Sequence, residues 1–131
     1  MLNKKSSFIQ GTIIIAIAII MGAFAAHALK EVLSPEKLDS FKTGVRYQTY
    51  HGFALLILPL LQAYCSKSLK TIQVLFLVGT TLFSGSIYVL SIQEILGMSL
   101  KFLGPVTPIG GALLIFAWIL LSLKLYKNYQ S

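Results

Sequence analysis

Charged residues are scarce in this sequence. Asp, Glu, Lys and Arg make up 11% of its 131 residues, whereas hydrophobic residues make up 56%. A soluble domain carries about a quarter charged residues, because it must cover its surface with groups that water can solvate. The shortage therefore argues against a soluble globule and indicates that much of the surface faces lipid.

Cysteine is nearly absent as well, since Cys65 is the single one in the chain. One cysteine cannot form an internal disulfide, and there is no Cys-x-x-Cys pair and no haem-attachment spacing. A phosphate-binding glycine loop, a nucleophile paired with a base and carboxylates at acid–base spacing are also missing. We therefore predict no enzymatic activity, no cofactor and no metal.

Acidic residues are the scarcest charges, with four acids against eleven Lys and Arg and a net charge of +7. In a soluble protein this excess would suggest nucleic acid as a partner. Here the cations stand singly or in pairs at the edges of apolar runs, as anchors that flank membrane spans do. We expect the lipid bilayer as the partner, and no nucleic acid.

Long apolar runs are what the sequence has in place of charge. A helix rises about 1.5 Å per residue, so about 20 apolar residues cross the hydrocarbon core of a bilayer. The first run also resembles a secretory signal, but it is long for one. We predict an all-α integral membrane four-helix bundle, a single domain over residues 1–131, with spans at about 8–28, 46–65, 71–93 and 107–126.

A polar stretch separates the first two predicted spans. Residues Ser34 to Glu36 are typical of a helix start, because serine can cap, the proline between them suits the first turn and an acid suits the positive end of the helix dipole. Leu38, Phe41 and Val45 then recur at spacings of three and four. We predict a short amphipathic interfacial helix between the first and second spans, the alternative being a solvated connector.

The lysines also predict an orientation. Four spans would place both termini and the 66–70 loop on one side, and that side carries six lysines and no acid: Lys4, Lys5, Lys67, Lys70, Lys124 and Lys127. The other side carries five cations and all four acids. Because the side rich in cations faces the cytoplasm, we predict a multi-pass protein of the plasma (inner) membrane with cytoplasmic N- and C-termini.

Small residues indicate where membrane helices approach one another closely. In the first span they recur at every fourth residue, one interrupts the third span, and two open the fourth. We predict helix packing at these six positions: Ala18, Gly22, Ala26, Gly85, Gly110 and Gly111.

The densest polar and aromatic stretch runs from Gly44 to Gly52 as Gly-Val-Arg-Tyr-Gln-Thr-Tyr-His-Gly. His27 ends the preceding apolar run on the same predicted side, and Thr107 before Pro108 is typical of a helix cap and first turn. We expect six side chains to converge in a cluster at the outer face: His27, Arg46, Tyr47, Gln48, His51 and Glu94. Four more residues are candidates for the same ligand site or polar network: Tyr50, Ser84, Ser86 and Thr107.

Several roles are open to this cluster. The simplest is a polar network that ties helix ends together. Sharper alternatives are a haem held by His27 and His51, a zinc ion that would need a further ligand such as Glu94, and a quinone or lipid-headgroup pocket that uses Arg46 and the tyrosines. Two histidines alone are weak support for a metal, so we predict the network.

Four blocks of the sequence, one per span, resemble the signatures of a known family. They are residues 22–29 (Gly-Ala-Phe-Ala-Ala-His-Ala-Leu), 43–52 (Thr followed by the stretch above), 83–88 (Phe-Ser-Gly-Ser-Ile-Tyr) and 104–111 (Gly-Pro-Val-Thr-Pro-Ile-Gly-Gly). Together they are similar to domain-of-unknown-function family 423, which includes small bacterial inner-membrane proteins and the eukaryotic transmembrane protein 256. The resemblance implies a four-helix membrane protein and no established reaction.

Some bacterial members of that family are associated with membrane integrity and virulence traits, so the resemblance implies a supporting role. We expect an accessory or stabilising component of the plasma membrane, or of a larger membrane complex, or one that associates with itself. The alternative is a binder of a lipid, quinone or haem at an outer-face site between the first and second helices.

Overall fold

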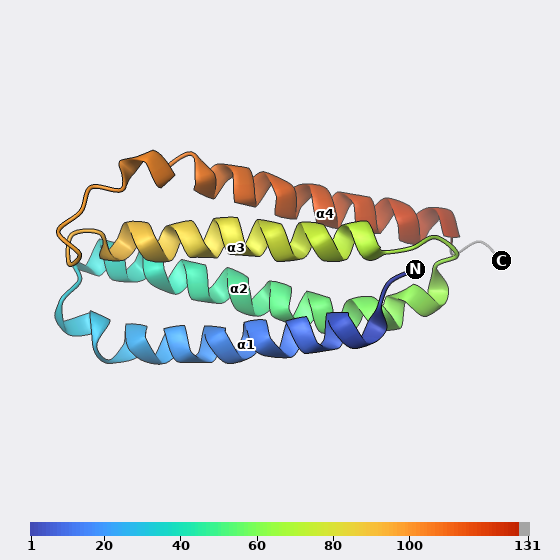
Figure 1. The fold of residues 1–131 in the computed structure, drawn as a ribbon, viewed down its shortest axis with the longest axis horizontal. Helices are drawn as coiled ribbons and strands as arrows, with labels where there is room; N and C mark the ends of the chain where they lie inside the picture. The colour runs from blue at the N-terminus through green and yellow to red at the C-terminus, as the bar shows by residue number, and fades with distance from the viewer. Residues whose placement is uncertain (129–131) are drawn as a thin grey trace.

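The computed structural model describes residues 1–128, and within them all regular structure is helical. Four long helices lie side by side (Figure 1): α1 (Lys4–Ala26), α2 (Pro35–Leu61), α3 (Lys70–Ile92) and α4 (Val106–Asn128). Three single 3₁₀ turns lie in the connections: η1 (Leu29–Glu31), η2 (Gln62–Tyr64) and η3 (Lys101–Leu103). The expectation of an all-helical chain is confirmed.

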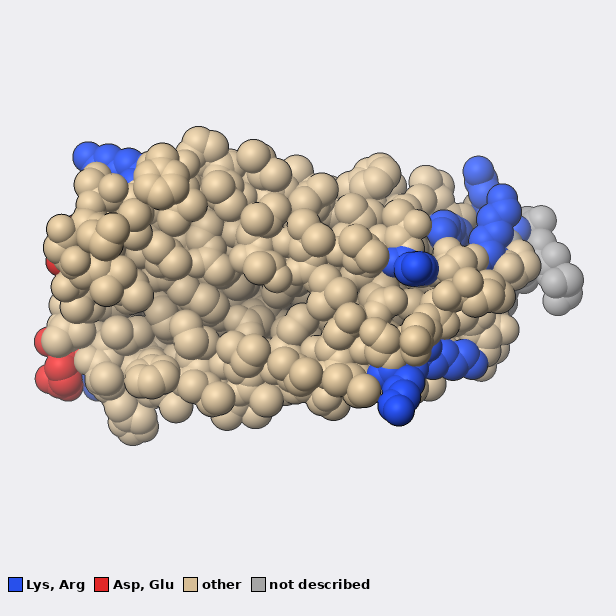
Figure 2. Space-filling view, in the orientation of Figure 1, with Lys and Arg blue, Asp and Glu red and all other residues tan. Residues whose placement is uncertain are grey.

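Each helix packs on the next one along the chain. The main contacts join α1 to α2, α2 to α3 and α3 to α4, so α2 and α3 are inner helices. Successive helices run in opposite directions, which brings the N-terminus and the end of α4 to the same end (Figure 1). Lysine side chains gather at that end, and acids lie at the opposite end (Figure 2).

Three stretches are long and apolar enough to cross a membrane: Lys4–Glu31, Lys70–Ile92 and Lys101–Lys127. They contain α1, α3 and α4. α2 does not meet this criterion, because its first half is rich in polar residues such as Lys42, Arg46 and Gln48. Its neighbours α1 and α3 cover α2 on two sides instead.

The start of α2 is where the sequence predicts it. Ser34 caps the helix, its Oγ accepting a hydrogen bond from the Lys37 backbone N–H at 3.3 Å, and Pro35 is the first helical residue. The prediction of a separate interfacial helix is wrong, because α2 continues without a break to Leu61. No proline interrupts residues 36–58, and the ring of Phe41 packs on α3, so the first turns stay in line with the rest.

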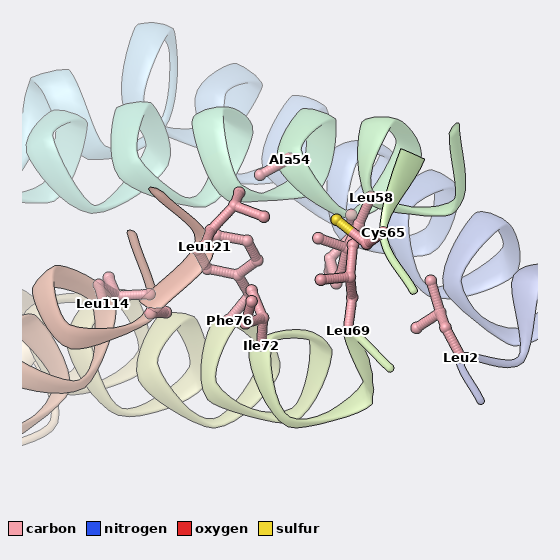
Figure 3. Packing of buried hydrophobic residues seen from close by; sticks show 11 residues of the cluster. Leu2, Ala54, Leu58, Cys65, Leu69, Ile72, Phe76, Leu114 and Leu121 are labelled. Atoms are coloured by element: carbon pink, nitrogen blue, oxygen red, sulfur yellow. The ribbon is translucent and has the colours of Figure 1, made fainter. Parts of the chain in front are cut away.

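The core consists of two clusters. The smaller one is Ala25, Phe41 and Tyr88, with the Phe41 and Tyr88 ring centroids 4.7 Å apart. The larger one joins the N-terminal segment, α2, α3 and α4 toward the lysine-rich end (Figure 3): Leu2, Ala54, Leu55, Leu58, Cys65, Leu69, Ile72, Phe76, Leu114, Ala117 and Leu121. Together they bury α2 and α3 more deeply than α1.

Glycines bring α1 and α2 into close contact. A Cβ atom on Gly11 would lie 2.9 Å from the Gly52 carbonyl oxygen and 2.8 Å from Leu56 Cδ2. Such distances leave no room for a side chain, so the backbones of the two helices nearly touch at this level. The contact sets how far α2 is shifted along α1.

The predicted packing stripe on α1 needs a correction. Ala18 is buried and Gly22 is half-buried near Val45, but Ala26 is exposed and Ala25 is buried in its place. The contact positions Gly11, Ala18 and Ala25 are seven residues apart, which is the spacing of helices that cross at a shallow angle. Residues spaced strictly four apart, such as Ala18, Gly22 and Ala26, turn gradually away from the neighbouring helix.

Packing at the glycines of α3 and α4 also differs from position to position. A Cβ atom on Gly110 would lie 2.9 Å from the Leu82 carbonyl carbon and closer still to the Phe83 backbone nitrogen, and one on Gly111 would touch the Phe83 ring at 3.4 Å. A Cβ atom on Gly85 would meet nothing within 4 Å. The prediction of packing at Gly85 is therefore wrong, since that glycine faces an open space.

Candidate functional site

Gln48, at the midpoint of α2, joins three helices. Its Nε2 donates a hydrogen bond to the Ile14 carbonyl oxygen of α1 at 2.9 Å, and its Oε1 accepts one from the Tyr88 hydroxyl of α3 at 2.7 Å. Both partners are buried or half-buried, so water does not compete for these bonds. One amide side chain thereby holds α1, α2 and α3 at a common level.

Two serines of α3 extend this network. Ser84 Oγ donates to the Gly44 carbonyl oxygen of α2 at 2.7 Å, and Ser86 Oγ lies 2.6 Å from Thr107 Oγ1 of α4. Thr107 is not the cap that its position before Pro108 predicts, because α4 already begins at Val106. Its hydroxyl bonds to the neighbouring helix, and so the network reaches all four helices.

His51 lies one turn beyond Gln48, and both nitrogens of its ring have partners. The indole N–H of Trp118 can only donate, so His51 Nε2 accepts that bond, which measures 3.1 Å. The ring hydrogen is then on Nδ1, which donates to the Tyr47 carbonyl oxygen at 2.7 Å. A metal or haem at His51 would have to break the bond to Trp118.

The two histidines do not meet. His51 follows Gln48 on α2, at the level where Gly52 packs on Ile15 of α1. Twelve residues, about 18 Å of helix, separate Ile15 from the exposed His27 at the end of α1. Sequence reasoning placed both at one depth because each lies near the edge of an apolar run. The interpretation of a haem or other ligand shared by the two rings is therefore wrong.

The other candidates lie outside the network. Arg46, Tyr47, Tyr50 and Glu94 are exposed. Tyr47 nevertheless packs on the Phe83 ring of α3, with 5.0 Å between centroids. Among the described residues no group of three His, Cys, Asp or Glu side chains is arranged to hold a metal ion. The arrangement therefore does not support a zinc ion held by the two histidines and Glu94.

Sequence reasoning missed several members of the network. Trp118 is the single tryptophan of the chain and lies 67 positions from His51, so no local spacing joins them. The acceptor on α1 is the backbone carbonyl oxygen of Ile14, and a pattern of side chains cannot predict which backbone group accepts a bond. The sequence did carry one indication of where α1 contacts α2: small residues recur every seven positions on α1, at Gly11, Ala18 and Ala25.

Comparison with known proteins places the chain among membrane proteins. The profile of a family described as "Protein of unknown function (DUF423)" matches residues 21–111. A UPF0382 membrane protein of Staphylococcus aureus is 37% identical over 123 residues, which cover 94% of this chain and 97% of that protein.

Other bacteria have similar proteins. A UPF0382 membrane protein of Bacillus subtilis is 35% identical over 125 residues, covering 94% of this chain and 98% of its own length. One of Haemophilus influenzae is 34% identical over 108 residues, covering 82% of this chain and 83% of its own. No solved structure gives a significant match. The matched region 21–111 includes Gln48, Ser84 and Tyr88.

Proposed function

This chain belongs to the DUF423 family, and we propose that it is a four-span protein of the plasma membrane that acts as a non-catalytic accessory or stabilising component. The observation that carries the proposal is the internal network. Gln48, His51 and Ser84 each bond to another helix or to a backbone carbonyl inside the protein. Their polar groups hold the helices together.

Three apolar helices and the position of the fourth support the proposal of four spans. α1, α3 and α4 have the length and composition of membrane spans. α2 packs between α1 and α3 and shares hydrogen bonds with both through Gln48. With Gln48 and His51 buried against the other helices, α2 exposes fewer polar groups to lipid.

The orientation is argued from charge. The end that holds both termini carries the six lysines, and the opposite end carries the acids. Positive residues stay on the cytoplasmic side during insertion. We expect a fluorescent protein fused to the C-terminus to be bright and a phosphatase fused there to be inactive; an active phosphatase would reverse the proposed topology.

A non-catalytic role is argued from how the polar groups are used. A general acid or base must reach the proton that it transfers, whereas both nitrogens of His51 are already bonded within the protein. A component that stabilises a membrane assembly needs a rigid body and apolar surface for its neighbours. α1 and α4 supply such surface, since most of their large side chains are exposed.

The test is purification in a mild detergent or a native-like polymer disc. The proposal predicts that tagged protein brings down a larger membrane complex in fixed stoichiometry, or a defined oligomer of itself. A variant with substitutions on the exposed face of α4, such as Ile115→Ser with Ile119→Ser, should lose this association while remaining helical by circular dichroism. Substrate-dependent turnover by the isolated protein would contradict the proposal.

A further inference from the structure

A cavity of about 200 Å³ lies between α1 and α3, with α2 as its floor. It is lined by residues of all three helices: Ile14, Ile17, Gln48, Thr80, Thr81, Ser84, Gly85 and Tyr88. Figure 2 shows the surface hollowed along the middle of this face. The opening is lateral, toward the lipid that surrounds upright helices, so a molecule would enter from the bilayer.

One polar group in the cavity wall has no partner. Thr80 is 4% exposed, and its Oγ1 makes no hydrogen bond to any described residue. Nearby hydroxyls are bonded, that of Ser84 to the Gly44 carbonyl oxygen and that of Thr81 to the Leu77 carbonyl oxygen. A buried unpaired hydroxyl lowers stability. The Thr80 oxygen itself has almost no accessible surface, so the side chain would have to rotate about its Cα–Cβ bond for an acceptor in the cavity to satisfy it.

Gly85 keeps the cavity open. It is one of the lining residues, and a Cβ atom on it would meet nothing within 4 Å. A larger side chain at this position would project into free space instead of into a neighbouring helix. The cavity therefore depends on residue 85 having no side chain, and it can be filled without disturbing the packing.

The depth of the cavity restricts what can bind. Thr80 lies ten residues after Lys70, about 15 Å along a helix whose 23 residues span about 34 Å. The hydrocarbon core is about 30 Å thick, so Thr80 lies near its centre. Phospholipid headgroups stay at the surface of the bilayer, far from this hydroxyl, and a charged molecule at this depth is costly.

We propose that this cavity binds the head of a neutral, lipid-soluble carbonyl compound, of the isoprenoid quinone class, whose oxygen accepts a hydrogen bond from Thr80. The ring would lie beside Gly85, against Ile14 and Ile17 of α1. The volume is smaller than that of a pocket that encloses a whole drug-sized ligand, so the apolar tail would lie along the groove in lipid. This binding role goes beyond the accessory function proposed above.

The experiment uses the full chain in nanodiscs of synthetic phosphatidylcholine, titrated with tritiated decyl-benzoquinone and compared with empty discs. We expect saturable binding of one molecule per chain. Gly85→Leu should weaken binding at least tenfold by filling the cavity. Thr80→Val should weaken it about fivefold, the effect of one lost hydrogen bond, without lowering the stability of the unliganded protein.

Matched variants control for general effects. Ala112→Leu adds bulk on the exposed face of α4, and Thr12→Val removes a hydroxyl that bonds to its own helix; both should bind as the wild type does. If Gly85→Leu loses helicity, Gly85→Ala replaces it, with a smaller expected loss. No saturable binding above empty discs, unchanged binding by a folded Gly85→Leu, or equal competition by decylbenzene, which has no oxygen, would each overturn the proposal.

Discussion

α1 and α2 pack on each other, yet most of α1 is exposed at the surface while much more of α2 is buried against other helices. Four of the 23 residues of α1 are buried, against nine of the 27 in α2. α1 has no polar side chain between Ile13 and Ala26 and presents small residues to its neighbour, whereas α2 contains Gln48 and His51 and lies between two helices. The criterion of length and mean hydropathy therefore selects α1, which would face lipid, and leaves out α2, which its neighbours cover.

The comparison predicts the largest effect where the two backbones touch. Gly11→Leu should force α1 away from Gly52 and lower the free energy of unfolding by about 3 kcal/mol, the upper range for overpacking. Circular dichroism during denaturation with dodecyl sulfate in mixed micelles would measure it. Gly22→Ala is the matched control, because its new Cβ would lie an ordinary 3.5 Å from Val45; equal losses from both variants would contradict the contact.

The polar side of the comparison predicts a somewhat smaller effect. Gln48→Leu leaves the Tyr88 hydroxyl without its acceptor and should lower the free energy of unfolding by about 2 kcal/mol, the cost of a buried unpaired group. Adding Tyr88→Phe should recover part of that loss, because both partners are then apolar. The same denaturation assay distinguishes the two cases, and a double variant less stable than Gln48→Leu would argue against the bond.

The link from α2 to α4 can be measured through the single tryptophan. Breaking the bond between Trp118 and His51 should lower the free energy of unfolding by about 1 kcal/mol, which is typical of one net hydrogen bond. The measurement is a double-mutant cycle with His51→Leu and Trp118→Phe. His51→Leu should also shift the emission of Trp118, and an unchanged emission spectrum would show that the indole N–H does not bond to the imidazole.

The smallest effect concerns the exposed side of α1. Ala26→Leu should alter the free energy of unfolding by less than about 0.5 kcal/mol, as surface substitutions do. Ala25→Leu, one position earlier, should cost about 2 kcal/mol because Ala25 is 2% exposed. Thermal melts of the two variants side by side would decide this, and a larger loss at Ala26 would restore the four-residue stripe.

Family membership and the helical fold could be predicted from the sequence because they rest on local features. The start of α2 follows from a serine and a proline at adjacent positions. The relative shift of α1 and α2 could not be predicted, because it is decided by contacts between Gly11 and Gly52 and between Ile14 and Gln48. These pairs are 41 and 34 positions apart and have no local pattern.

Part of the candidate site could be predicted for a related reason. Gln48, Ser84 and Ser86 stand out as polar residues in apolar surroundings, and each bonds inside the protein. His27 and Arg46 stand out in the same way but are exposed. Composition shows which residues are polar, while the side to which a helix turns them depends on how its neighbours pack.

The polar first half of α2 has a consequence for biogenesis. A segment that is too hydrophilic to partition into lipid on its own must leave the translocon together with a partner that covers it. α1 is synthesised first and offers the Ile14 carbonyl to Gln48, so the two helices should enter the bilayer as a hairpin.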